Sequence, residues 1–194
     1  CLPTQSGKVE EGVDKLEQAW SRAPDSAYVA SNLAVAYSCA KEYGKGVEVC
    51  CQALEKDALN PYVNCALGML YSSMGNREKV AEQVERIKLC PLDDWDAANK
   101  AAMALAEMGA WEDAQKLFHR LVDGNVFDVD LLHRAAANCY KLGLYEEAER
   151  HWSRAARIEP DSAVISWHLK ESRRAKESGK PRQGLSFGMM LPLD

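Results

Sequence analysis

The side chains most able to do chemistry in this sequence are seven cysteines and four histidines. No two cysteines are separated by two residues, the spacing that a zinc knuckle or a thioredoxin-like redox motif requires. No two histidines stand at metal-ligand spacing on one helix, and neither a nucleophile elbow nor a phosphate-binding glycine loop is present. We therefore predict no catalytic residues, no metal, no cofactor and no enzymatic activity. The residues concerned are Cys1, Cys39, Cys50, Cys51, Cys65, Cys90, Cys139, His119, His133, His151 and His168.

The cysteines fit a reducing compartment better than a disulfide framework. They form an odd set without regular spacing, and most fall at apolar positions, where free cysteine behaves as a small hydrophobic residue. Cys50 and Cys51 are adjacent on an expected helix, so we expect one buried and one exposed thiol. These features predict a cytoplasmic protein. The alternative for Cys1 is the lipidated first residue of a mature lipoprotein.

Composition and charge exclude several classes of protein. The chain has 194 residues, of which 47% are hydrophobic and 27% charged, as in folded domains and unlike disordered chains. A net charge of −5 gives no general attraction to nucleic acid or to an anionic membrane. A short basic stretch, Arg173-Arg174-Ala-Lys176, is interpreted as a solvated helix face. We predict partners that are neither nucleic acid nor membrane.

A repeat of 34 residues governs the whole organisation. Gly75, Gly109 and Gly143 are 34 residues apart, and further steps back reach Lys41 and Gly7. Small residues hold the eighth and twentieth places of each repeat, where two helices can approach closely, and larger residues hold the twenty-fourth place. The glycine ends the first helix in a left-handed conformation. The eighth-place residues are Ala34, Gly68, Ala102 and Ala136, the twentieth-place residues are Gly46, Val80, Ala114 and Ala148, and the twenty-fourth-place residues are Cys50, Val84, Phe118 and Trp152.

This pattern resembles the tetratricopeptide repeat family over residues 7–162, most closely in KLGLYEEAERHWSRAARIEPDS (141–162) and MGAWEDAQKLFHRLV (108–122). The resemblance implies an all-α, right-handed superhelical solenoid of antiparallel helix pairs. We expect about eleven helices over residues 7–178. The predicted parts are a half repeat (7–26), four repeats (27–60, 61–94, 95–128 and 129–162) and a capping helix (163–178).

The two ends of the chain depart from the repeat. Residues 1–6 are too short to supply the partner of the first helix, expected over about Lys8–Ser21, so they are a truncation point or an irregular flank. Residues 179–194 consist of a breaker-rich linker and an apolar tail that begins at Leu185. The tail is predicted to be a docking segment or the beginning of a further domain.

The resemblance also implies a binding groove lined by the first helices of the repeats, which would hold a peptide or a partner protein. In the first two repeats this groove is uncharged and includes two tyrosines and a methionine, whereas the later repeats contribute charged residues. We therefore predict a ligand with an apolar and an acidic element, the acidic one between Lys100 and Arg134. The predicted groove residues are Tyr28, Asn32, Tyr62, Met69, Asn99, Lys100, Met103, His133, Arg134 and Lys141.

The leading functional interpretation is a peptide-binding scaffold or adaptor. One alternative is a self-assembly module that associates through the C-terminal tail or the open first helix. Another is the substrate-recruiting region of a larger enzyme. The lysine and asparagine by which some co-chaperones of this family clamp a terminal carboxylate do not occur at the matching places, which hold pairs such as Ser31/Val35 and Cys65/Met69.

Overall fold

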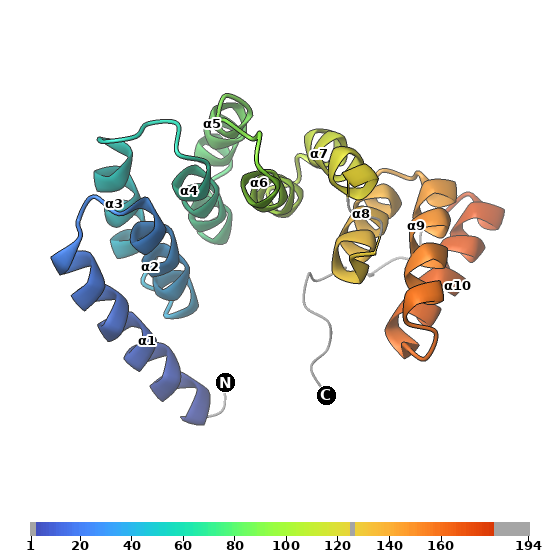
Figure 1. Cartoon of the computed structure of the whole chain (residues 1–194), viewed down its shortest axis with the longest axis horizontal. Coiled ribbons are helices and arrows are strands. Elements are labelled where there is room, and N and C mark those ends of the chain that lie inside the picture. Colours follow the sequence, from blue (N-terminus) through green and yellow to red (C-terminus); the bar gives the residue numbers. More distant parts are fainter. Residues whose placement is uncertain (1–2, 125–126, 181–194) are drawn as a thin grey trace. The chain divides into compact units, whose positions relative to one another are not determined.

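The described residues, 3–124 and 127–180 of the computed structural model, form ten α-helices and no strand. About eleven helices were expected, but four helix pairs with one flanking helix at each end make ten (Figure 1). The helices are α1 (Pro3–Arg22), α2 (Ala27–Cys39), α3 (Tyr43–Leu54), α4 (Pro61–Ser73), α5 (Arg77–Lys88), α6 (Trp95–Glu107), α7 (Trp111–Gly124), α8 (Val129–Lys141), α9 (Tyr145–Ile158) and α10 (Ala163–Ser178).

Each first helix of the repeat starts at a side-chain cap. The residue before α2, α4, α6, α8 and α10 accepts a hydrogen bond from the backbone N–H three residues later, which satisfies an otherwise unpaired donor of the first turn. These caps recur every 34 residues and hold the repeat in phase. They are Ser26, Asn60, Asp94, Asp128 and Ser162.

The turn after each first helix takes the left-handed conformation predicted for the glycines. Gly75, Gly109 and Gly143 have φ of 70°, 80° and 77°. Lys41, at the same place of repeat 27–60, has φ of 62°. The turn geometry is therefore kept even where a side chain must adopt a conformation that favours glycine.

The close approach predicted between the eighth and twentieth places is confirmed in repeat 27–60. A Cβ atom built on Gly46 of α3 would lie 3.0 Å from a methyl carbon of Leu70 and 3.5 Å from the carbonyl oxygen of Ala34 in α2. Ala34 itself is fully buried. The seam between α2 and α3 thus leaves little room for a larger side chain.

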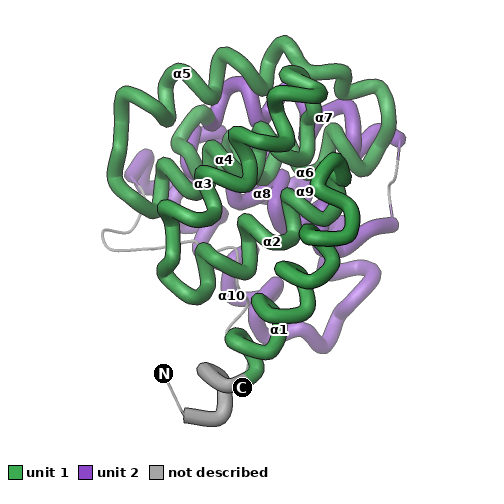
Figure 2. Tube along the Cα trace, turned by 90° about the vertical axis from the view of Figure 1, so that its left-hand side faces the viewer, with its two compact units in different colours: residues 1–110 green, residues 111–194 purple. Residues whose placement is uncertain are grey.

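The chain divides into two compact units, residues 1–110 (unit 1) and 111–194 (unit 2), coloured separately in Figure 2. In unit 1, α4 contacts both α2 and α6, while α3 and α5 lie on the other side of these first helices (Figure 1). In unit 2, α8 contacts α7 and α9, and α9 contacts α10. Within each unit the helices pack against near neighbours in the sequence, as in a stack of repeats.

At the ends, the capping helix has the bounds predicted for it, Ala163–Ser178. The first helix begins earlier than the predicted Lys8, at Pro3, because proline is tolerated in the first turn, where its missing N–H has no partner to lose. Helix α7 ends at Gly124, as expected for a repeat without the terminal proline. Residues 181–194, with the predicted tail, lie outside the described residues.

Candidate functional site

The first-helix face of unit 1 carries an apolar row at the ninth place of each repeat. Val35 of α2 is 50% exposed and Met69 of α4 is 39% exposed, while Met103 of α6 is half-buried. These residues are 34 positions apart on helices that contact in the order α2, α4, α6. A row of apolar side chains that remains accessible is suited to contact with apolar groups of a partner.

Two tyrosines stand at the second place of the same helices. Tyr28 is 78% exposed at the start of α2. Tyr62 is half-buried, and its pKa is raised to about 12 by desolvation and by hydrogen bonding to Asp96 of α6. The hydroxyl of Tyr62 is therefore engaged with the neighbouring helix, whereas Tyr28 presents its ring to solvent.

The polar residues predicted for the unit 1 face differ in accessibility. The amide of Asn32 donates to the carbonyl of Tyr28 at 2.9 Å, within its own helix. Asn99 is only 8% exposed, and its Oδ1 has no hydrogen-bond partner among the described residues. Lys100 is exposed. Of these three side chains, Lys100 alone is open to solvent.

Lys100 and Cys65 also show how adjacent first helices meet. Burial raises the pKa of the Cys65 thiol to about 12, and the nearby charge of Lys100 opposes that rise. Cys65 holds the fifth place of its repeat and Lys100 the sixth place of the next, a separation of 35 residues. The sequence placed Cys65 and Ala66 on the groove face, but both are buried between helices.

In unit 2 the predicted residues lie on α8. Arg134 is half-buried and Lys141 is exposed. His133 is half-buried, and its Nδ1 accepts a hydrogen bond of 3.1 Å from the indole N–H of Trp152 in α9. Because Lys100 belongs to unit 1 and Arg134 to unit 2, a shared acidic ligand between them stays a prediction.

His133 is part of an aromatic cluster that the sequence did not predict. The ring of His168 stacks on the buried Trp152, with centroids 5.1 Å apart and planes at 11°, and meets His133 edge-on at 4.9 Å. Trp167, which is 41% exposed, meets His168 edge-on at 4.9 Å. The cluster connects the core of unit 2 to its surface through α8, α9 and α10.

Burial keeps these histidines neutral at physiological pH. It lowers the pKa of His168 to about 4, helped by the nearby His133. It also lowers the pKa of His133, with the charge of Asp130 opposing and that of Arg134 adding to the effect. The signal for this pairing was in the sequence, because His133 and His168 are 35 residues apart, like Cys65 and Lys100.

Two other assignments from the sequence need correction. His151 was expected to be a partly exposed residue, but it is 9% exposed and burial lowers its pKa to about 4. Tyr140 was placed on the groove surface, but it is buried and its hydroxyl donates to Glu171 at 3.1 Å. Cys50 is buried and Cys51 exposed, which confirms the prediction for that pair.

The basic stretch at the C-terminus is used largely within the protein. Arg173 donates to Glu149 at 2.9 Å, and the ammonium of Lys176 lies 3.3 Å from the same carboxylate. Arg174 pairs with Glu171 in its own helix. These pairs fasten α10 to α9 and neutralise the basic charges, which supports the interpretation of a solvated helix face.

The chemistry of the described residues is limited. No group of three or more histidine, cysteine or acidic side chains among residues 3–124 and 127–180 is placed to hold a metal ion. No helix within these ranges is both long and apolar enough to cross a membrane. The absence of a catalytic site and the cytoplasmic location stay predictions.

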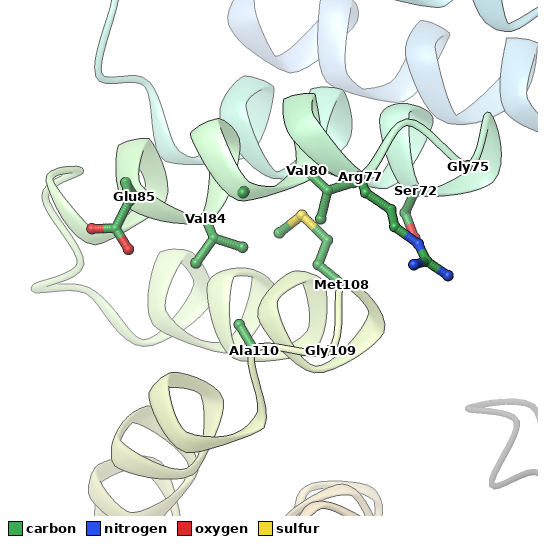
Figure 3. Close-up of a pocket in the computed structure, with 10 residues that line it drawn as sticks. Ser72, Gly75, Arg77, Val80, Val84, Glu85, Met108, Gly109 and Ala110 are labelled. Carbon is green, nitrogen blue, oxygen red and sulfur yellow. The ribbon is translucent and has the colours of Figure 1, made fainter.

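A cavity of about 590 Å³ lies in unit 1 away from the first-helix face (Figure 3). It is bordered by Val80 and Val84 of α5 and by Met108 and Ala110 at the end of α6, with Arg77 and Glu85 at its margins. The Met108 side chain reaches up between the two valines (Figure 3). None of the predicted groove residues lines this cavity.

No family model matches the sequence, and no curated protein matches it. Solved structures do resemble it. TTC0263, a thermophilic TPR protein of Thermus thermophilus, gives a TM-score of 0.63 at 11% identity over 87% of this chain and 92% of that one. PilF of Pseudomonas aeruginosa gives 0.60 at 20% identity over 91% and 79%.

A third similar structure is YrrB, a TPR protein with an unusual peptide-binding site. Its TM-score is 0.55 at 18% identity, with 87% of each chain covered. At these identities the likeness concerns the fold, and it agrees with the 34-residue helix pairs, the recurring caps and the left-handed turns described above. The expected fold class is confirmed: the chain is an all-α protein with the tetratricopeptide repeat fold.

Proposed function

We propose that this protein is an interaction scaffold that binds a peptide segment of a partner protein along its first-helix face. The observation that carries the proposal is the accessible apolar row Val35, Met69 and Met103 across three adjacent first helices, with the exposed ring of Tyr28 nearby. YrrB, which has a similar fold, has a peptide-binding site, and this supports the same use of the fold here.

The ligand that fits this face has an apolar element. Val35, Met69 and Met103 carry no charge, and methionine adapts its shape to different side chains. An acidic element would be attracted by the exposed ammonium of Lys100 and by the guanidinium of Arg134. A peptide with an apolar stretch followed by acidic residues is therefore the preferred class of ligand. Self-assembly and recruitment for a larger enzyme remain the alternative functions.

A selection from a random peptide display library tests the proposal. Peptides that bind the intact chain should be enriched in apolar and acidic residues. Their affinity should fall about tenfold or more when Met69 is replaced in Met69→Glu, because a charge then meets apolar groups.

The matched control is Leu89→Glu, since Leu89 is 70% exposed in the loop after α5 and so is also an exposed apolar residue of unit 1. Selected peptides that bind Met69→Glu as tightly as they bind the unchanged protein would place the site elsewhere.

A further inference from the structure

The surface around Trp167 suits a docked apolar segment. Its indole is 41% exposed on α10 and is held from behind by the ring of His168, which itself stacks on the fully buried Trp152. A ring supported in this way loses little conformational freedom on binding, so contact with it costs less entropy than contact with a free side chain.

The path along α10 from its end to Trp167 is electrically balanced. Glu171 is buried, and its carboxylate is paired with Arg174 and accepts a hydrogen bond from Tyr140 of α8. A segment lying there meets no uncompensated carboxylate from Glu171. An apolar ligand is therefore tolerated along this face, whereas a strongly charged one gains nothing from it.

The chain itself supplies such a segment. Residues 185–194, LSFGMMLPLD, contain six large apolar side chains and a single charge, that of Asp194. They follow directly after α10 and the linker 179–184, so the effective concentration of this segment near Trp167 is high.

The lengths also agree. Trp167 precedes Ser178, the last residue of α10, by eleven residues, which is about 17 Å along a helix axis. Gly179 has a φ of 66°, a left-handed conformation that turns the chain at the helix end. The five residues 180–184, fully extended, span about 17 Å. A chain that turns back at Gly179 therefore brings Leu185 and Phe187 level with Trp167.

We infer that residues 185–194 fold back in cis along α10 and dock on Trp167, so that the tail occupies the unit 2 part of the first-helix face and competes with a bound peptide. This inference rests on the proposed function, because the tail is then an internal ligand of the same face. Contacts of Phe187 with the indole of Trp167 and of the tail methionines with aromatic edges would stabilise the docked state.

Hydrogen–deuterium exchange on the intact chain tests the inference. Amides in 185–194 should exchange about tenfold or more slowly than in an unstructured peptide of the same sequence, and the protection should be independent of protein concentration. Trp167→Ala should abolish the protection. The control is Trp111→Ala, because Trp111 is 36% exposed on α7 of the same unit and lies outside this surface. Circular dichroism and the melting temperature check that each variant folds.

Three results would overturn the inference: exchange at unstructured rates throughout 185–194, protection that persists in Trp167→Ala, or protection that grows with concentration, which would indicate docking onto a second copy. A separate readout distinguishes this from failure of the proposed function. Phe187→Ala should tighten the binding of library-selected peptides about threefold or more, because the competitor is weakened. If those peptides bind but the tail is unprotected, only the tail inference fails.

Discussion

The indole N–H of Trp152 donates to Nδ1 of His133 across 3.1 Å, and this bond joins the core of unit 2 to its first-helix face. A protonated imidazole carries hydrogen on both nitrogens and cannot accept at Nδ1. The bond therefore requires neutral His133. His168, edge-on to His133, adds a second reason, because two charges 4.9 Å apart at the ring centres would repel each other.

This relationship predicts that acid destabilises the protein. Burial holds the pKa of His133 below its usual 6.5 and lowers that of His168 to about 4. Below pH 6.5 the unfolded chain then binds more protons than the folded one, so the stabilisation is fully present above that pH and is lost as the pH falls toward 4. After allowance for partial solvent screening, we expect a loss of about 1–2 kcal/mol in the free energy of unfolding.

Urea unfolding at several pH values measures this effect. His168→Gln should reduce the pH dependence, since one of the coupled groups is removed. His119→Gln is the control, because His119 is exposed on α7. The same pH dependence in His168→Gln and the unchanged protein would show that the cluster does not control acid stability.

The sequence predicted most of the fold because the repeat encodes it locally. The left-handed turns at Gly75, Gly109 and Gly143 and the close approach at Gly46 each depend on the absence of a Cβ atom, which is visible in the residue type. The caps at Ser26, Asn60, Asp94, Asp128 and Ser162 were also visible at their 34-residue spacing, but were not used.

The site was harder to predict because exposure depends on which way each side chain turns within a half-buried face. Asn99 and Cys65 hold groove places in the repeat yet are buried, whereas Tyr28 and Met69 are exposed there. The pairing of His133 with Trp152 depends on tertiary contact between α8 and α9 and on one ring orientation, which periodicity does not specify.

The turn at Lys41 predicts a stabilising substitution. Lys41 adopts a φ of 62°, which costs a residue with a Cβ atom more than glycine. Lys41→Gly should therefore raise the free energy of unfolding by about 0.5–1 kcal/mol, the conformational relief being partly offset by the flexibility of glycine in the unfolded chain. Thermal unfolding followed by circular dichroism measures this. The reciprocal control, Gly109→Lys, should lower stability, and a loss of stability in Lys41→Gly would contradict the account.

The seam of repeat 129–162 predicts an overpacking effect. Ala136 of α8 and Ala148 of α9 are both fully buried at the eighth and twentieth places, where close approach was found around Gly46 in repeat 27–60. Ala148→Leu should cost about 1–3 kcal/mol, because the added carbons force the helices apart. Ala163→Leu, at the exposed start of α10, is the control. An unchanged melting temperature for Ala148→Leu would mean that these two helices do not meet at this seam.

The final prediction concerns Lys100 and Arg134, which hold the sixth place of adjacent repeats. First helices of neighbouring repeats pack about 8–10 Å apart, a distance that one acidic group of a ligand can bridge. Lys100→Glu with Arg134→Glu should weaken binding of the selected acidic peptides about tenfold or more and flatten its dependence on salt, because the attraction between opposite charges becomes a repulsion. The control is Lys8→Glu with Lys56→Glu, two exposed lysines whose reversal changes the net charge equally. Fluorescence anisotropy at low and high salt gives both quantities. If binding to the double reversal matched that of the control at both salt concentrations, the acidic element would have to bind away from these two helices.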